Sequence, residues 1–190
     1  MELKVNTESL REESYIEILK CKWTILVITK IIEGVTRPSE VKRAIPGLST
    51  KVLNERIKKL ELKGIIRRKS FTGYPLHVEY VLSVQGKRLR PLIGELKRMG
   101  LPLDDVSEVI NCKWMVSILS LLRKGEARTN RIKRSLAGIS NKVLSDRLRK
   151  LEKMGFISRM VIDSNPPGVF YSLTKRGKGF INFLKNKVIP

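Results

Sequence analysis

Polar side chains that can hydrogen-bond nucleic-acid bases recur at helical spacing in two segments of the chain. Drawn as a helix at about 100° per residue, the segment 51–63 has two distinct faces. Its apolar face is formed by Val52, Leu53, Ile57 and Leu60. Its polar face is formed by Lys51, Asn54, Glu55 and Lys58. Side chains of these polar types reach base edges or phosphates from a DNA major groove, so we expect this face to contact a duplex.

A second segment carries an equivalent polar face with different residues. This face is formed by Lys142, Ser145, Asp146 and Arg149. The residues that open the two helices belong to the same candidate site, and they are Ser49, Thr50, Ser140 and Asn141. Ser49 is also a favourable N-cap. The alternative is that both faces are merely solvated. We favour contact with DNA because of the surrounding elements and the basic excess described below.

Further cations lie on two segments that read as β-hairpins. The first hairpin carries Arg67, Arg68, Lys69 and His77, whereas the second retains Arg159 and has Asp163 near its tip. Cations on such a hairpin contact phosphates or a minor groove, so we expect the first hairpin to bind more strongly. Charges that protect a strand edge would explain one or two of these residues but not the cluster.

Arg56 and Arg147 differ from the other cations because they fall within the apolar arc of their helices. A buried arginine needs a partner, and its aliphatic stem can pack against neighbours. We therefore expect these two residues to be structural or to clamp phosphates rather than to read bases.

The chain repeats itself after 91 residues, without a gap, over residues 21–86. Cys21-Lys22-Trp23 matches Cys112-Lys113-Trp114, and Lys51-Val52-Leu53 matches Lys142-Val143-Leu144. This period is too long for a solenoid repeat and suits a small domain. Gly100 and Pro102 interrupt the chain between the copies. We therefore predict two domains, residues 1–100 and 101–190.

Each copy predicts the same order of elements. In the first copy we expect a helix over 10–33, broken near Cys21, then a helix over 38–44 and a third over 51–63. Strands over 65–69 and 77–82 flank a turn at 71–75, and a last helix over 83–99 should kink at Pro91. Trp23 and Trp114 are expected in the cores. The predicted fold is mainly α with small β-hairpins (α+β), as two tandem winged helix-turn-helix domains.

The composition points to a polyanionic partner. The 190 residues carry a net charge of +21, with 42% hydrophobic residues, which is enough to build folded cores. The longest apolar run is too short to span a membrane, and the N-terminus does not resemble a signal peptide, so we expect a cytoplasmic, nucleoid-associated protein without a membrane partner.

Two cysteines and one histidine cannot form a four-ligand zinc site within one chain. The sequence also lacks a glycine-rich phosphate loop and a nucleophile with a paired base, so we expect no enzymatic activity, no catalytic residues and no cofactor.

These motifs resemble the HxlR-type family of winged helix-turn-helix regulators, twice along the chain. The first copy matches through Lys22-Trp23, Gly47-Leu48-Ser49-Thr50-Lys51-Val52-Leu53, Gly64-Ile65-Ile66, Tyr80-Val81-Leu82-Ser83 and Pro91. The second matches through Lys113-Trp114, Gly138-Ile139-Ser140-Asn141-Lys142-Val143-Leu144 and Tyr171-Ser172-Leu173-Thr174. The resemblance implies binding of double-stranded DNA through the third helix and the wing. In the family that these motifs resemble, most members are single-module homodimers of bacteria and archaea.

The fusion of two modules predicts an intramolecular pseudo-dimer, with further homodimerisation open. Apolar stripes in the last helices would suit the pairing, namely Leu89, Leu92, Ile93 and Leu96 in one copy and Phe180, Phe183 and Leu184 in the other. The unlike reading faces then predict unlike half-sites about 34 Å apart. The rival interpretation is that the stripes close each module's own core.

Two other functions remain open at this point. An architectural protein that coats DNA with little sequence preference would also be strongly basic. A protein-interaction module or an RNA binder is disfavoured because no exposed aromatic stacking stripe is evident.

Some family members sense oxidants through a cysteine ahead of the first helix. No cysteine precedes Cys21 here, so we expect Cys21 and Cys112 to be buried packing residues.

Overall fold

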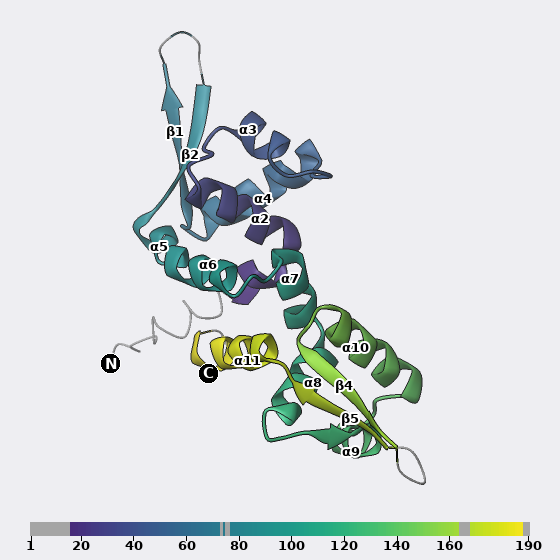
Figure 1. The fold of residues 1–190 in the computed structure, drawn as a ribbon. Coiled ribbons are helices and arrows are strands. Elements are labelled where there is room, and N and C mark those ends of the chain that lie inside the picture. The colour runs from purple at the N-terminus through teal and green to yellow at the C-terminus, as the bar shows by residue number, and fades with distance from the viewer. Residues whose placement is uncertain (1–15, 73, 75–76, 164–167, 188–190) are drawn as a thin grey trace, which may run out of the picture. The chain divides into compact units, whose positions relative to one another are not determined.

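A computed structural model describes residues 16–72, 74, 77–163 and 168–187 of the chain (Figure 1). Contacts between residues divide it into two compact units, residues 1–107 and 108–190, called unit 1 and unit 2 below. The sequence placed a boundary near residue 100, whereas the contacts divide the chain within α7 (Leu103–Asn111). In the described part, no helix combines the length and apolar character that crossing a membrane requires.

Unit 1 follows the predicted order of elements. Residues 16–20 are helical and Cys21 interrupts the helix, as expected. The elements that follow are α2 (Lys22–Ile32), α3 (Pro38–Arg43), α4 (Thr50–Leu62), β1 (Ile66–Phe71), β2 (His77–Leu82), α5 (Val84–Lys87) and α6 (Leu89–Arg98). β1 and β2 form an antiparallel hairpin in which Ile66 is paired with Leu82 and Phe71 with His77. Phe71, expected in the turn, therefore belongs to the strand.

Unit 2 repeats this order with one additional strand and with a single last helix in place of α5 and α6. Its elements are α8 (Lys113–Leu122), β3 (Ala127–Arg128), α9 (Thr129–Ser135), α10 (Asn141–Lys153), β4 (Ile157–Ile162), β5 (Gly168–Leu173) and α11 (Lys175–Lys187). The sheet order is β3-β5-β4, and both pairings are antiparallel. Each unit is thus a winged helix-turn-helix, and the predicted fold class is confirmed. Sequence analysis missed β3.

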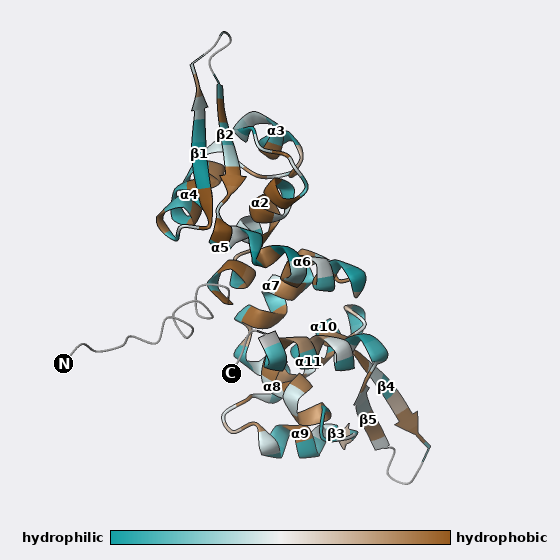
Figure 2. Ribbon diagram, turned by 90° about the vertical axis from the view of Figure 1, so that its left-hand side faces the viewer, coloured by the Kyte–Doolittle hydropathy of each residue, from teal (hydrophilic) through white to brown (hydrophobic). Residues whose placement is uncertain are grey.

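The core of each unit is built around its first complete helix. Ile25 and Ile28 of α2 are fully buried, as are Ile118 and Leu119 of α8. The third helix contributes one apolar edge to each core, formed by Leu53, Ile57 and Leu60 in α4 and by Leu144, Leu148 and Leu151 in α10. Figure 2 shows the difference between core and surface in unit 1: hydrophobic colour is concentrated on the core helix α2, and hydrophilic colour lies along the strand β1. The third helices therefore keep a polar face in solvent.

Two expectations about the core are wrong. Trp23 and Trp114 are half-buried rather than enclosed, and so is Val52. Each indole lies instead beneath the preceding lysine, with Lys22 Nζ 5.1 Å and Lys113 Nζ 5.0 Å from the ring centroids. A tryptophan at the start of a helix can cover the core edge with one face and hold a cation over the other.

The last helix of unit 1 breaks before the predicted proline kink. α5 ends at Lys87, Arg88 forms the junction, and α6 begins at Leu89. Pro91 has no N–H to donate to the Lys87 carbonyl, and its ring crowds that carbonyl, so the helix is interrupted one turn earlier than the proline itself.

Glycine is required where this last helix meets the hairpin. A Cβ added to Gly86 would lie 2.0 Å from the Ile65 carbonyl oxygen, and one added to Gly177 would lie 2.0 Å from that of Phe156. Ser83, the N-cap of α5, binds the same junction, since its hydroxyl donates to the Gly64 carbonyl at 2.5 Å. In both units, therefore, the last helix packs against the start of the hairpin at a glycine that lies directly on a backbone carbonyl.

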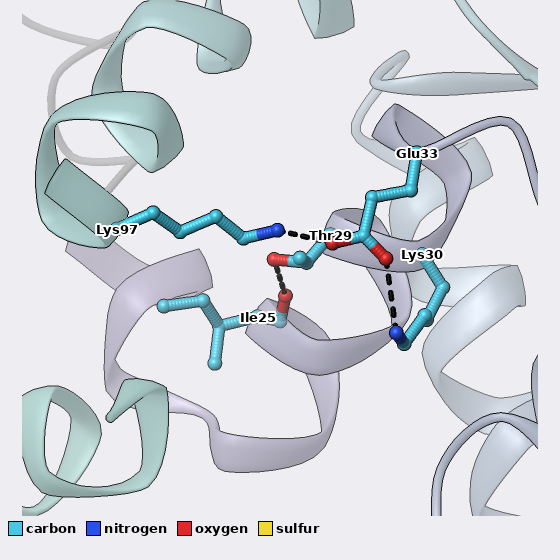
Figure 3. A network of polar contacts seen from close by, with 5 residues as sticks. All are labelled: Ile25, Thr29, Lys30, Glu33 and Lys97. Carbon is cyan, nitrogen blue, oxygen red and sulfur yellow. Dashed lines mark hydrogen bonds and ion pairs between the residues drawn. The ribbon is translucent and has the colours of Figure 1, made fainter. Parts of the chain in front are cut away.

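A polar network joins α2 to α6 in unit 1 (Figure 3). The Glu33 carboxylate accepts from Lys30 at 2.9 Å and from Lys97 at the end of α6. Hydrogen bonds from Lys97 and Lys30 lower the pKa of Glu33, against an opposing effect of burial. Thr29 uses its hydroxyl within the helix, donating to the Ile25 carbonyl at 2.7 Å.

The apolar stripes of the last helices are buried. Leu89, Ile93 and Leu96 are at most 1% exposed. In unit 2, the Phe180 ring packs 4.9 Å from that of Phe156 in the same unit. The α11 stripe therefore contributes to its own unit's core, and pairing of the two units stays a prediction.

Candidate nucleic-acid interface

The polar face of α4 is presented to solvent by a capped helix. The Ser49 hydroxyl accepts a hydrogen bond from the Val52 N–H at 3.2 Å, which fixes the start of the helix. The face itself is exposed in full, comprising Thr50, Lys51, Asn54, Glu55 and Lys58. No ion pair engages Lys51 or Lys58 among the described residues. Both ammonium groups are therefore available to an anionic partner.

α10 offers the equivalent face with the same order of charges but with different side chains after the first lysine. Ser140 caps it by accepting from the Val143 N–H at 3.2 Å. Asn141, Lys142, Ser145 and Arg149 are exposed, whereas Asp146 is half-buried. Arg149 Nη1 lies 3.7 Å from Asp146 Oδ1, so part of its charge is compensated in the free protein. The two faces share a lysine at the first turn and diverge after it.

Arg56 and Arg147 lie at the border between core and surface. Both are half-buried, and the Nε atom of each is buried without a hydrogen-bond partner among the described residues. Arg56 Nη2 approaches Glu55 Oε2 only at 3.9 Å. The guanidinium groups thus retain donors that the protein does not satisfy, and the same feature occurs in both units.

The first wing distributes its three cations over both of its faces. Side chains alternate along a strand, so Arg68 points away from Arg67 and Lys69. Burial and Glu61 raise the pKa of Tyr80, the cross-strand partner of Arg68, while Arg68 lowers it, which places Arg68 on the side of α4. Arg67 and Lys69 lie on the opposite side. The sequence had assigned all three to one interface.

His77 is engaged within the first wing. Its ring stacks on Phe71 with the centroids 4.5 Å apart, and its Nε2 lies 3.6 Å from Glu79 Oε1. Glu79 also lies 3.7 Å from Arg37 Nε. The predicted role of His77 in DNA binding would therefore compete with these contacts.

The second wing is apolar where the first is basic. Met160, Val161 and Ile162 are 49%, 54% and 38% exposed, at the positions that Lys69, Ser70 and Phe71 occupy in the first wing. Arg159 lines an open cavity of about 390 Å³ together with Ser145 and Arg149 of α10. The structure therefore brings three predicted residues of unit 2 together, and they lie between the third helix and the wing.

Four further cations were missed by sequence analysis. Lys42 and Arg43 end α3, and Lys133 and Arg134 lie in the last turn of α9. All four are exposed, and no ion pair holds them in the part of the chain that the structure describes. The signal was present in the sequence, because the 91-residue repeat retains a Lys-Arg pair at both places.

The cysteines are half-buried at the N-cap positions of two helices rather than buried packing residues, which corrects the expectation. Cys21 precedes α2 and Cys112 precedes α8, and both are half-buried. Burial raises the pKa of the Cys21 thiol, but hydrogen bonds from Thr24 and the charge of Arg56 lower it, with a net decrease. Within the described residues, no group of three or more His, Cys, Asp or Glu side chains could hold a metal ion.

Comparison with known proteins identifies the same family in both units. The family described as HxlR-like helix-turn-helix matches residues 18–104 and again residues 109–187. The HTH-type transcriptional regulator YvaP of Bacillus subtilis (strain 168) is 39% identical over 88 residues, which cover 46% of this chain and 82% of YvaP. YtfH of Escherichia coli (strain K12), also an HTH-type transcriptional regulator, is 36% identical over 85 residues, covering 45% and 68%.

Among solved structures, diamide-treated YodB from B. subtilis is 28% identical, with a TM-score of 0.40 over 42% of this chain and 78% of YodB. The relatives are transcriptional regulators rather than enzymes, which confirms the expectation of a non-enzymatic protein. With nearly all of both units matched, the chain belongs to the HxlR-like helix-turn-helix family as a tandem pair of family modules.

Proposed function

We propose that the protein is a sequence-specific regulator of transcription that reads double-stranded DNA with two non-identical helices. The observation that carries this proposal is the repeated exposure of a capped, polar third helix with an unpaired lysine in its first turn, Lys51 and Lys142. In a helix-turn-helix, this part of the helix enters the major groove and contacts base edges. Because the two faces differ beyond the lysine, each would prefer its own sequence.

Phosphate contacts would come from the elements around each reading helix. Lys42, Arg43, Lys133 and Arg134 end the helix that crosses the backbone in this fold. Arg56 and Arg147 are half-buried at the border of the same surface, and the exposed part of each guanidinium could donate to a phosphate oxygen, whereas the Nε atoms are buried.

The wings would contribute unequally. Arg68 on the α4 side of the first wing can contact phosphates or enter the minor groove, as can Arg159 in unit 2. The exposed Met160 and Val161 offer no charge to a phosphate, which leaves Arg159 as the cation of β4. The wing of unit 1 would then attract DNA more strongly than the wing of unit 2.

The tandem arrangement suits one chain that binds two unlike half-sites as an intramolecular pseudo-dimer. Two recognition helices placed about 34 Å apart would meet successive major grooves on one face of the duplex. Further homodimerisation would extend the site symmetrically. The predicted place of such a protein is the cytoplasm, at the nucleoid.

An architectural role is the second candidate, and the net charge of +21 favours it. Selection of bound duplexes from a random pool, followed by titration of the winning duplex and a scrambled one at the same salt concentration, separates the two functions. A specific regulator should prefer its operator by a factor on the order of 10³ or more. A ratio near one would leave the architectural role and reject ours, and no binding to any duplex at low salt would reject both.

A further inference from the structure

A cation-lined cavity in unit 1 lies apart from the reading helix. It is open, has a volume of about 550 Å³, and is bordered by Arg67, Arg68, Lys69, Lys87 and Arg90. These residues come from β1, α5 and α6, and no residue of α4 lines it. Strand alternation directs Arg67 and Lys69 to one side of the wing and Arg68 to the α4 side, although Arg68 also lines the cavity.

The positive charge of this cavity is not compensated by the protein. No ion pair engages Arg67, Lys69, Lys87 or Arg90 among the described residues, and no carboxylate lines the cavity. The two acidic residues nearest to the cavity along the chain contact other cations, although Glu79 is also the cross-strand partner of Lys69. Glu33 accepts from Lys30 and Lys97, and Glu79 lies beside Arg37 and His77.

The cavity also has an apolar part. Ile31 and Leu82 are buried side chains at its border, and Val81 is half-buried. A ligand that fits both parts carries a multiply charged group and a less polar body. Closely spaced Arg and Lys side chains favour a phosphate over a single carboxylate, because a phosphate offers more acceptor oxygens and more charge.

The corresponding surface of unit 2 has lost this character. The 91-residue repeat replaces Arg67 by Ser158, Lys69 by Met160 and Arg90 by Ile181. Ser158 is hydrogen-bonded to Ser172 at 2.9 Å, and Ile181 is 1% exposed. Two modules of common origin therefore differ at three of the cavity's cations, so the cluster is not a requirement of the fold.

We propose that unit 1 binds a small phosphorylated ligand in this cavity, through Arg67, Lys69, Lys87 and Arg90. Since Arg67 and Lys69 belong to the wing, a bound phosphate would neutralise charge that also attracts DNA. Occupancy would thus weaken DNA binding, and this second consequence rests on the proposed function. Binding of the ligand itself does not.

Titration calorimetry with inorganic pyrophosphate, on the full chain without DNA and at constant ionic strength, tests the binding directly. The variant Lys87→Gln/Arg90→Gln removes two cavity cations that lie outside the predicted DNA interface. Its matched control, Arg88→Gln/Arg98→Gln, removes two exposed cations of the same region that do not line the cavity. Thermal melting of both variants verifies that they are folded.

The expected result is one pyrophosphate site per chain, weakened about tenfold or more in Lys87→Gln/Arg90→Gln and less than about twofold in the control. Equal weakening in both variants, or equal binding of sulfate, would mean that net charge alone attracts the anion and would overturn the proposal. Loss of DNA affinity in the cavity variant, in proportion to its loss of pyrophosphate, would assign these cations to the duplex instead. Pyrophosphate binding without any DNA binding would leave the site standing and reject only the regulator.

Discussion

Lys97 and Glu33 join the ends of two helices, because the ammonium group at the end of α6 donates to the carboxylate at the C-cap of α2. Lys30 binds the same carboxylate from one turn earlier in α2. Two cations thus hold one acidic group between the core helix and the helix that follows the wing.

Replacement of Glu33 by glutamine is expected to destabilise unit 1 by about 0.5–1 kcal/mol at pH 7, since a partly exposed pair contributes no more than this. The pKa of Glu33 is lowered in the folded protein. Its contribution is therefore complete above the unfolded pKa of about 4.3 and is lost as pH falls through the folded value.

Urea unfolding followed by Trp23 fluorescence in a Trp114→Phe background measures unit 1 alone. The difference between Glu33→Gln and the parent should shrink between pH 7 and pH 3. Glu95→Gln, in α6 but without an ion pair among the described residues, serves as the control. A Glu33→Gln effect that is unchanged at pH 3 would contradict the linkage.

The two reading helices should respond independently to loss of their first-turn lysines. Lys51→Ala and Lys142→Ala are each expected to weaken operator binding about tenfold, roughly 1–2 kcal/mol, without a change in melting temperature because both side chains are exposed. Base changes in the half-site that unit 1 reads should then reduce the affinity of Lys51→Ala less than that of the parent. The same changes should reduce the affinity of Lys142→Ala as much as that of the parent.

Gel shifts on the selected operator and on duplexes with one scrambled half-site check this prediction. Arg98→Ala removes a charge at an exposed position outside both helices and should change affinity less than about twofold. If Lys51→Ala and Lys142→Ala lose discrimination at the same bases, the assignment of one half-site to each unit is wrong.

Local signals were sufficient to predict the third helices, whereas burial was predicted less well. Ser49 and Ser140 cap their helices through a hydroxyl that bonds three residues on, which depends only on neighbouring sequence. Burial of Trp23 depends on what covers the start of α2, and the sequence carries no such information. β3 escaped prediction because a strand of two residues has no periodicity.

The distribution of the first wing's cations over its two faces could have been predicted from the sequence. Arg67, Arg68 and Lys69 are consecutive, and strand alternation alone separates the middle one from its neighbours. The sequence could not show that Lys87 and Arg90 line the same cavity as Arg67 and Lys69. Their placement depends on where the helix is interrupted between α5 and α6.

The environment of Cys21 predicts a difference in reactivity between the two cysteines. Burial opposes ionisation of the Cys21 thiol, but Thr24 and Arg56 lower its pKa overall. Met115 stands in the second unit where Thr24 stands in the first, so Cys112 lacks that hydroxyl. Because the thiolate is the nucleophile, iodoacetamide should alkylate Cys21 faster than Cys112 at pH 7.5, by a factor of roughly 2–5.

Mass spectrometry of the time course distinguishes the two sites. The variant Thr24→Val keeps the shape of this buried side chain and removes its hydroxyl, so alkylation of Cys21 should slow while that of Cys112 stays constant. Faster labelling of Cys112 in the parent, or an unchanged Cys21 rate in Thr24→Val, would show that the threonine does not control the thiol.

The cations that end α3 and α9 should bind DNA without regard to its sequence. Lys42→Ala and Lys133→Ala are each expected to weaken the operator and a scrambled duplex by the same factor. Each lost phosphate contact releases about one fewer counterion, so the slope of log K against log salt concentration should become less steep by about 0.9 per lysine. Fluorescence anisotropy between 50 and 200 mM salt, a range expected to change affinity by about 10³-fold or more for several contacts, resolves such a change.

The double variant tests whether both units contact the duplex at once. With simultaneous contact, Lys42→Ala/Lys133→Ala should reduce the slope by about 1.8, the sum of the two single effects. Arg88→Ala, which removes an exposed charge at the junction of α5 and α6, should leave the slope unchanged. If only one lysine alters the slope, a single unit makes the phosphate contacts, and the two modules cannot bind as a pair of reading heads.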